Sequence, residues 1–157
     1  MILFFLAQVT PVQPLPKGTG QPPAIDVDAP AVLATVQRMF DGLAARDAAA
    51  IVAQTRADGG ATVAAERSDG TRSVRHLSWT EFAAGIKPGP ERYREALTDP
   101  AVEIDGDIAM VWSPYRFTID GKLAHCGTDH FDLIREAGAW KVLNVTWTQR
   151  VTGCDAQ

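Results

Sequence analysis

Asp129 and His130 stand next to each other in the segment GTDHFDLIREAGAWKVLNVTW, residues 127–147. A carboxyl and an imidazole are groups that enzymes often use to transfer protons. The rest of the segment is typical of two strands around the turn Ala137-Gly138. Because successive side chains of a strand point to opposite faces, Asp129 and His130 are predicted to lie on opposite sides of a sheet and not to act as a pair.

Helices are expected before this sheet. The first begins at Asp28 or Ala29 with Pro30 in its first turn, and apolar residues then recur at helical spacing as far as Leu43. The second begins at Asp47 and is ended by Asp58-Gly59-Gly60. A short third helix is expected at 79–86.

Strand-like segments fill the remainder of the chain. Asp69-Gly70 predicts a hairpin between two strands within 61–78. Tight turns join antiparallel neighbours, so the sequence predicts an α+β fold whose N-terminal helices pack on a curved antiparallel sheet. The later strands are expected at about 92–104, 107–119, 122–135 and 139–151, with turns at Asp105-Gly106, Asp120-Gly121 and Ala137-Gly138.

The tight turns also set which side chains of the last three strands meet. The resulting register predicts Trp112 opposite Asp129, Asp129 opposite Thr146, and Phe131 opposite Asn144. A β-bulge near Pro114 would exchange the faces upstream of it. One sheet face is therefore expected to form a ligand-binding site from Trp112, Asp129, Phe131, Asn144 and Thr146.

Asp129 is the candidate catalytic group of this face. Beside Trp112 and Phe131 it would be poorly solvated, and burial raises the pKa of a carboxyl, so Asp129 would keep a proton to donate. The other interpretation is a carboxylate paired with Arg116, Thr146 or Asn144. The latter two side chains either orient a ligand or satisfy each other.

The opposite face is also apolar, because it is predicted to hold Leu143, Val145 and Trp147. Exposed apolar faces of this kind usually mark interfaces, so we expect a homodimer through the outer sheet face. A loop or the helix at 79–86 is the alternative cover.

Composition limits the partners. The formal net charge is −4, from 15 Lys+Arg and 19 Asp+Glu, and no block of like charges occurs. A nucleic-acid groove needs a concentrated basic face, so no nucleic-acid partner is expected. A membrane-spanning helix needs ~20 apolar residues, which no stretch of this sequence supplies.

The beginning of the chain differs in composition from the rest. Residues 1–8, MILFFLAQ, are similar to the end of a clipped export signal, although a short apolar tail has the same composition. Residues 9–29 are rich in Pro and Gly, which predicts an extended linker. We therefore expect a single domain at 30–154 in an exported, periplasmic protein.

Three stretches resemble the nuclear transport factor 2-like superfamily: the opening helix TVQRMFDGLAARD, the following AAAIVAQT and above all DHFDLIREAGAWKVLNVTW. The resemblance covers about residues 30–151. It implies a cone-shaped α+β fold with an interior pocket, as in ketosteroid isomerase and scytalone dehydratase. This fold hosts enzymes, binders and assembly domains, so the resemblance alone assigns no function.

Within this superfamily, TDHF is similar to the ketosteroid isomerase stretch whose aspartate stays protonated in an apolar pocket and donates a hydrogen bond to the developing oxyanion. Asp129 stands at that match. The isomerase also needs a tyrosine on the first helix and a base carboxylate on the first strand. This chain has Met39 and Ala65 there, with Glu66 one residue out of phase, which argues against that isomerase.

Bacterial members of the superfamily that this chain resembles also carry HCG at the start of the penultimate strand and a cysteine near the C-terminus. Cys126 and Cys154 match that layout. In an exported protein the two would form a disulfide if residues 151–153 fold back far enough; otherwise they are free thiols.

No metal or cofactor is expected. The three histidines lack the spacing of a metal site, and the sequence has no phosphate-binding loop, dinucleotide fingerprint or G-x-S-x-G motif. We expect a domain that binds a small apolar molecule, with no catalysis implied. One alternative is a lyase or isomerase in which Asp129 is the acid or hydrogen-bond donor and Glu66 or Tyr93 supplies a second group. Another is a structural or accessory dimerisation domain with a filled cone.

Overall fold

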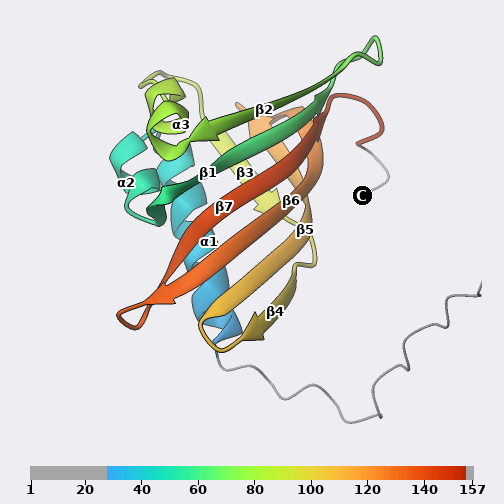
Figure 1. Ribbon diagram of the computed structural model, residues 1–157. Helices are drawn as coiled ribbons and strands as arrows, with labels where there is room; N and C mark the ends of the chain where they lie inside the picture. Colours follow the sequence, from blue (N-terminus) through green and yellow to red (C-terminus); the bar gives the residue numbers. More distant parts are fainter. Residues whose placement is uncertain (1–27, 155–157) are drawn as a thin grey trace, which may run out of the picture.

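The computed structural model describes residues 28–154, so the export signal expected at 1–8 and most of the linker expected at 9–29 lie outside the described residues. Helices lie on one side of a long, strongly twisted sheet (Figure 1), which confirms the predicted α+β class. None of the helices in the described part is long and apolar enough to cross a membrane. The elements are α1 (Ala29–Ala44), α2 (Ala48–Val52), β1 (Thr55–Glu66), β2 (Arg72–Ser78), α3 (Trp79–Gly85), β3 (Tyr93–Leu97), β4 (Ala101–Asp105), β5 (Ile108–Ile119), β6 (Lys122–Glu136) and β7 (Ala139–Arg150).

Helix α1 supplies the apolar layer that faces the sheet. It begins where the sequence predicts, with Asp28 at the N-cap and proline in its first turn. At its other end, Gly42 allows α2 to pack closely, because a β-carbon at this position would stand 3.0 Å from Ile51. Its buried residues recur every three to four positions: Val32, Thr35, Val36, Met39, Phe40 and Gly42.

Side-chain caps fix the two short helices. The Asp47 carboxylate accepts a hydrogen bond from the Ala50 amide at the start of α2, at 3.0 Å. Ser78 begins α3 through a capping box, in which its hydroxyl and the Glu81 side chain each accept from the other residue's backbone N–H. The caps hold both helices at the end of the sheet where the cavity lies.

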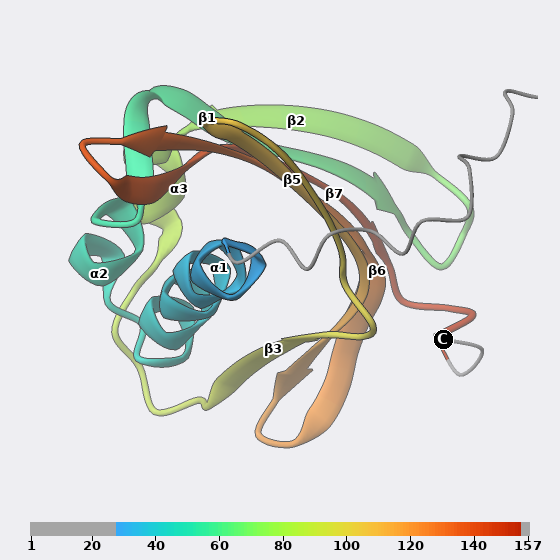
Figure 2. The ribbon, with the colours of Figure 1, turned by 90° about the horizontal axis from the view of Figure 1, so that it is seen from below.

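The sheet curls around α1 (Figure 2). Its strand order is β2-β1-β7-β6-β5-β3, and β4 also pairs with β5. Strands β5, β6 and β7 form the predicted antiparallel meander, whereas β1 lies parallel to β7. Because β3 pairs with residues 115–119 of β5 and β4 with residues 108–112, these two short strands share one edge of the sheet.

Two predictions about the elements were wrong. The sequence Asp58-Gly59-Gly60 lies inside β1 and does not end α2, which stops at Val52. The single strand expected at 92–104 is two strands, separated at 98–100, where Asp99 has a positive φ of 50°. The break lets the chain change direction along the edge of β5.

Two β-bulges determine which side chains face α1. One adds Ala124 to β6, opposite the step between Phe117 and Thr118. The other adds Leu143 to β7, opposite the step between Asp132 and Leu133. One extra residue moves the side chains that follow it to the opposite face of the sheet. Each bulge therefore reverses the predicted face of the residues that follow it in its strand.

Long-range contacts hold the bulge at Leu143 in place. The indole Nε1 of Trp79 donates a hydrogen bond to the Leu143 carbonyl at 3.1 Å. Gly59 approaches the same carbonyl so closely that a β-carbon would stand 1.7 Å from its oxygen. Glycine is therefore required at this point of β1, which explains why a Gly-Gly pair occurs within a strand.

The core fills one end of the space between α1 and the sheet. Val111 and Val142 are fully buried there, and Trp140 is 5% exposed beneath the Arg135 guanidinium, which lies 4.5 Å from the ring centroid. At the other end the side chains leave a cavity. The main buried contacts of the core are Val32, Val36, Phe40, Val111, Phe131, Leu133, Trp140 and Val142.

Candidate functional site

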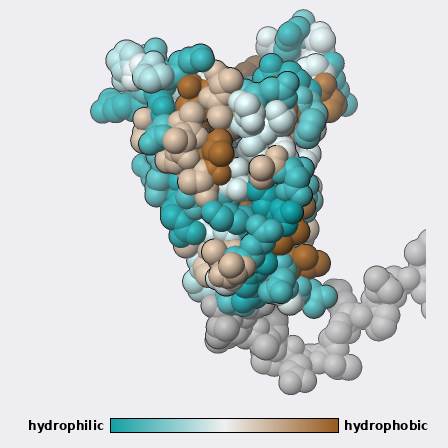
Figure 3. All heavy atoms as spheres, turned by 60° about the vertical axis from the view of Figure 1, so that its left-hand side comes forward, coloured by the Kyte–Doolittle hydropathy of each residue, from teal (hydrophilic) through white to brown (hydrophobic). Residues whose placement is uncertain are grey.

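A cavity of about 260 Å³ lies between the inner face of the sheet and the three helices. Its size is near the lower end of the range for small-molecule sites, ~300–1,000 Å³, so it suits a small ligand. Apolar side chains gather at the surface on the side of the molecule where α2 and α3 lie (Figure 3). The polar residues of its wall are Tyr93, Glu95, His125, Asp129 and Gln149, and the apolar residues are Met39, Phe40, Leu43, Ile51, Phe82, Ile86, Phe117, Ile119, Phe131, Val145 and Trp147.

Asp129 is the most deeply buried polar group of the wall. Its position on β6 points inward, between Ser113 of β5 and Trp147 of β7, and only 2% of it is exposed. Its Oδ2 has no hydrogen-bond donor among residues 28–154. Buried carboxyl oxygens are rarely left in this state, so the atom has an unused capacity for hydrogen bonding.

Glu95, on β3, is the polar partner of Asp129, because the two carboxyl groups form a side-chain hydrogen bond. Ionised carboxylates only accept hydrogen bonds, so this contact requires a proton on one of them. Glu95 also lines a second hollow of about 400 Å³ between α1 and β3, next to Asp41 and Arg94. The pair therefore connects the inner cavity with the outer surface of the β3 edge.

Burial is the main cause that raises the pKa of both carboxyls. For Asp129, the neighbouring negative charge of Glu95 and the hydrogen bond with it raise the pKa further. For Glu95, the bond with Asp129 works in the opposite direction and lowers the pKa. The pair therefore retains a proton at neutral pH, and the two carboxyls share it.

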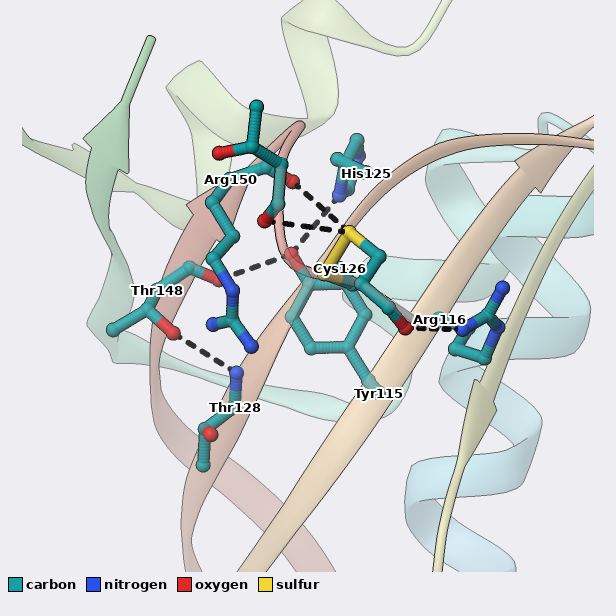
Figure 4. Close-up of a disulfide and its surroundings, with 9 residues drawn as sticks. Tyr115, Arg116, His125, Cys126, Thr128, Thr148 and Arg150 are labelled. Atoms are coloured by element: carbon teal, nitrogen blue, oxygen red, sulfur yellow. Dashed lines mark hydrogen bonds between the residues drawn. A yellow bond between two sulfur atoms is a disulfide. The ribbon is translucent and has the colours of Figure 1, made fainter. Parts of the chain in front are cut away.

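His125 lines the same cavity and is held by the buried phenol of Tyr115 (Figure 4). The Tyr115 hydroxyl donates to the Thr148 carbonyl at 3.1 Å and lies 3.0 Å from His125 Nδ1. A hydroxyl has one hydrogen, so Nδ1–H must donate to the hydroxyl, which leaves His125 Nε2 as an acceptor. Burial lowers the pKa of His125 to about 4, which keeps this ring neutral.

Tyr115 also keeps its hydroxyl proton. Burial raises the pKa of this phenol, and the charges of Asp129 and Glu95 raise it further. The His125 ring stacks on Phe117 at 4.6 Å between centroids, with the planes 13° apart. Both contacts fix the orientation of the imidazole, so the cavity contains a rigid neutral base as well as a protonated acid pair.

Arg46 positions Tyr93 at the rim of the cavity. Its guanidinium lies 4.4 Å from the centroid of the Tyr93 ring, and its Nη2 donates to the Tyr93 hydroxyl at 3.1 Å. Arg46 also forms an ion pair with Glu91. Its positive charge is therefore paired with Glu91, which does not line the cavity. The Tyr93 hydroxyl accepts from Arg46, so its own hydrogen is still available to donate.

A disulfide joins Cys126 of β6 to Cys154, 28 residues later (Figure 4). The C-terminal segment is thereby held against the outer side of the sheet, and both cysteines are buried. Arg116 Nη1 donates to the Cys154 carbonyl at 2.6 Å, which adds a second link to this segment. Since Cys126 directly follows His125, the disulfide anchors the strand at the point where the imidazole enters the cavity.

Two of the residues predicted for the ligand site, Asp129 and Phe131, line the cavity. The predicted positions of the other three were wrong, because the two bulges invert the faces. Trp112 is 53% exposed on the outer face, where its ring lies 5.8 Å from that of His130. Thr146 is exposed on the same face, and Asn144 accepts a hydrogen bond from the Gly60 amide at 3.2 Å, which secures the junction of β1 and β7.

The same inversion moves two residues into the cavity. Val145 and Trp147, which were expected on an apolar outer face, line the inner cavity instead. The expectation of a dimer interface built on them therefore loses its basis. Of the two groups considered as catalytic partners of Asp129, Tyr93 lines the cavity, whereas Glu66 forms an ion pair with Arg72 at the far end of β1.

Sequence reasoning did not identify Glu95 and His125 as site residues. The alternation Tyr93-Glu95-Leu97 in a short strand was the available signal for Glu95, since these residues share one face. His125 was hidden by the bulge at Ala124, which changes its face relative to the turn. Within residues 28–154, no group of His, Cys, Asp and Glu side chains could hold a metal ion.

A cone of α+β architecture that encloses a cavity beneath its first helix defines the nuclear transport factor 2-like superfamily, and the chain is a member of it. More narrowly, residues 27–148 match the sequence profile of the family described as "Putative lumazine-binding". The chain belongs to that family. No functionally curated protein matches it.

Solved structures from three bacteria are similar to this fold. A protein of unknown function with a cystatin-like fold from Nostoc punctiforme has 12% identity and a TM-score of 0.62, over 81% of this chain and 94% of the other. A nuclear transport factor 2-like protein from Cytophaga hutchinsonii has 14% identity and a TM-score of 0.61, over 75% and 94%. The "Putative Scytalone Dehydratase" of Novosphingobium aromaticivorans has 11% identity and a TM-score of 0.62, over 78% and 84%. At these identities the likeness shows the fold alone.

Proposed function

We propose that this domain binds a small, largely apolar molecule in the cavity beneath α1. The observation that carries the proposal is the Asp129 carboxyl, which is 2% exposed, has an Oδ2 without a donor in the described chain, and lies in an otherwise mostly apolar wall. A polar group of a ligand would complete its hydrogen bonding, while apolar surface around it would bury the rest of the ligand. The description of the family as lumazine-binding also supports a small-molecule ligand.

Native mass spectrometry of the protein purified from its own cells tests this proposal. We expect a reproducible added mass that is lost on denaturation. A variant that blocks the cavity, Gln149→Trp, should lose the added mass, because Gln149 lines the wall. Thr146→Trp is the matched control on the exposed face of the same strand. Retention of the added mass by Gln149→Trp would contradict binding in this cavity.

The second candidate function is catalysis of the lyase or isomerase type. It is favoured by the combination of a protonated acid, Asp129, and a neutral acceptor, His125 Nε2, in one cavity. An acid that holds its proton and a base that lacks one are the two requirements for moving a proton within a substrate. In this function Asp129 donates to an oxygen of the substrate and His125 accepts a proton from carbon.

Turnover distinguishes the two candidates. An enzyme predicts that Asp129→Asn and His125→Gln each abolish turnover while the circular dichroism spectrum and the thermal midpoint remain those of a folded protein. Asp132→Asn, on the outer face of the same strand, is the control that should retain turnover. A binder without catalysis would show reduced affinity in the first two variants and no product from any bound molecule.

Export and dimerisation are further parts of the proposal. The disulfide Cys126–Cys154 is compatible with an oxidising compartment such as the periplasm. The exposed Ile108 and Trp112 on the outer face support a homodimer there. Intact-mass analysis of the periplasmic fraction tests the first, and sedimentation of wild-type protein against Trp112→Glu tests the second. A purely structural dimerisation domain would dimerise but carry no ligand.

A further inference from the structure

The polar groups of the cavity wall favour one charge type in the ligand. Glu95 and the unpartnered Oδ2 of Asp129 are acceptors, and so is His125 Nε2 in the tautomer that Tyr115 imposes. The two remaining polar residues carry no positive charge: the Tyr93 hydroxyl is a donor, and the Gln149 amide both donates and accepts. No lysine or arginine is found among the described residues that line this cavity. The guanidinium that contacts Tyr93, that of Arg46, is engaged with Glu91 and with the Tyr93 hydroxyl.

The apolar part of the wall is rich in aromatic rings. Phe40 and Phe131 meet edge to face at 5.9 Å between centroids, and Tyr93 and Phe117 at 5.4 Å. Aromatic faces attract organic cations, and the attraction increases when both partners are removed from water. The rings of the wall belong to Phe40, Phe82, Tyr93, Phe117, Phe131 and Trp147.

We propose that the ligand of this cavity is a hydrophobic amine whose protonated nitrogen lies against Glu95 and Asp129 and whose apolar body lies among the aromatic rings. The inference rests on the proposed binding function and adds the chemical class of the ligand to it. The nitrogen supplies the hydrogen-bond donors that the unpartnered Asp129 oxygen lacks. An anionic ligand is disfavoured, because the pair carries one negative charge at neutral pH and no lysine or arginine of the described wall compensates it.

Binding of such a cation is linked to the protons of the acid pair. In the free protein, burial raises the pKa of both carboxyls, so at acidic pH both are protonated. An ammonium group stabilises their ionised forms, and the pair therefore releases a proton as the amine binds. The proton has a route to solvent, because Glu95 also lines the hollow between α1 and β3.

The other titratable groups near the pair do not change their protonation in the same way as pH changes. Tyr115 of β5 keeps its proton throughout, and His125 of β6 stays neutral above its pKa of about 4. Arg150 of β7 is close enough to act on Tyr115, and Asp41 of α1 and Arg94 of β3 line the outer hollow beside Glu95. As pH rises towards the pKa of about 7 that burial gives Glu95, the acid pair is thus the group that changes charge in the cavity. The affinity for an amine should rise by up to ~tenfold per pH unit below that pKa and level off above it.

Three probes that share one ring system test the inference: 2-(2-naphthyl)ethylamine, 2-(2-naphthyl)ethanol and 2-naphthylacetate, which are a cation, a neutral molecule and an anion. Isothermal titration calorimetry should show the amine binding at least ~tenfold more tightly than the alcohol at pH 7.5, with no binding of the acetate. Calorimetry in two buffers of different ionisation enthalpy should reveal proton release for the amine alone.

Variants connect this selectivity to the acid pair. Glu95→Gln and Asp129→Asn should each remove most of the preference for the amine over the alcohol and flatten its pH dependence. Glu95 lies half-buried on a short edge strand, so Glu95→Gln provides a folded variant if Asp129→Asn fails to fold. Glu103→Gln and Asp132→Asn, acids outside the cavity wall on β4 and β6, are the matched controls and should retain the preference.

Failure of the amine assignment and failure of the proposed binding function would give different results. Equal or tighter binding of the alcohol or the acetate would overturn the assignment of an amine, while binding in the cavity would still stand. Binding of the amine that survives Glu95→Gln and Asp129→Asn unchanged would also overturn it, since the nitrogen would then lie elsewhere. Absence of binding by all three probes, together with clean protein from its own cells, would overturn the proposed function itself.

Discussion

The two faces of strands β5, β6 and β7 carry the same residue types in opposite situations. Trp140 is 5% exposed on the inner face, whereas Trp112 is 53% exposed on the outer face. Asp129 is 2% exposed in the cavity wall, whereas the Asp132 side chain, three residues along the same strand, is 46% exposed beside His130. In this sheet, therefore, the face on which a side chain lies, and not its residue type, determines whether it belongs to the core, the site or the surface.

The largest effect should come from the inner tryptophan. Trp140→Ala removes a buried ring from the filled end of the core and its contact with the Arg135 guanidinium, and we expect the free energy of unfolding to fall by ~3–5 kcal/mol. Equilibrium unfolding in urea measures this loss. A loss below ~1 kcal/mol would mean that the filled end of the cone is not the stabilising core described here.

The disulfide marks the place where the outer face is covered, because the C-terminal segment packs over Cys126 there. It closes a loop between residues 28 positions apart, and a loop of that length is expected to contribute ~3–4 kcal/mol through the entropy of the unfolded chain. Urea unfolding with and without a thiol reductant should show this loss. The double variant Cys126→Ser, Cys154→Ser should show the same loss and no response to the reductant.

The two aspartates of β6 should differ in their effect on the pH dependence of stability. The folded pKa of Asp129 is raised, so the folded state binds more protons than the unfolded state, and this group's contribution to stability is lost as pH rises above the ordinary carboxyl range near ~4. Unfolding curves from about pH 5 to about pH 9 should therefore slope downward more in wild type than in Asp129→Asn, by up to ~1.4 kcal/mol per pH unit.

Asp132→Asn is the matched control for this slope, and it should leave the wild-type pH dependence in place. If Asp129→Asn also left the slope unchanged, the aspartate would be ionised in the folded protein, and the proton shared with Glu95 would not exist. Glu95→Gln should reduce the slope as well, since the two carboxyls lie within hydrogen-bonding reach.

His125 should affect stability at acidic pH, in contrast to Asp129, whose effect appears as pH rises. Its folded pKa is lowered to about 4, so the unfolded state binds more protons below ~6.5, and the stabilisation that it contributes is lost as pH falls from ~6.5 to about 4. His125→Gln should remove this part of the acid sensitivity. His130→Gln, on the outer face, is the comparison, and an equal effect of both variants would contradict the assignment of a neutral, buried His125.

The helices, the turns and the antiparallel meander could be predicted because each depends on local signals. Pro30 and the spacing of apolar residues mark α1, and Asp120-Gly121 and Ala137-Gly138 occupy the predicted turns with positive φ at all four residues. The class of the fold follows from such signals alone. The inward position of Asp129 and Phe131 was also predicted, although from a register that was one residue out.

The rest of the site depends on contacts that are distant in sequence. The bulge at Leu143 is secured by Trp79 and Gly59, both more than sixty residues away, and no local pattern around Leu143 reveals it. This one residue reverses the faces of the residues that follow it in β7. The sequence therefore predicted Asn144 and Thr146 inside and Trp147 outside, the reverse of the structure. Glu95 was missed for a related reason, since β3 reaches Asp129 only through the break at 98–100 and the curl of the sheet.

The smallest stability effect should come from the outer tryptophan. Trp112→Ala removes a half-exposed ring that contacts His130, and the free energy of unfolding should change by less than ~1 kcal/mol. Urea unfolding of the monomer measures this, at concentrations low enough to prevent association. A loss as large as that of Trp140→Ala in the monomer would mean that the chain itself buries Trp112, and the contrast between the two sheet faces would not hold.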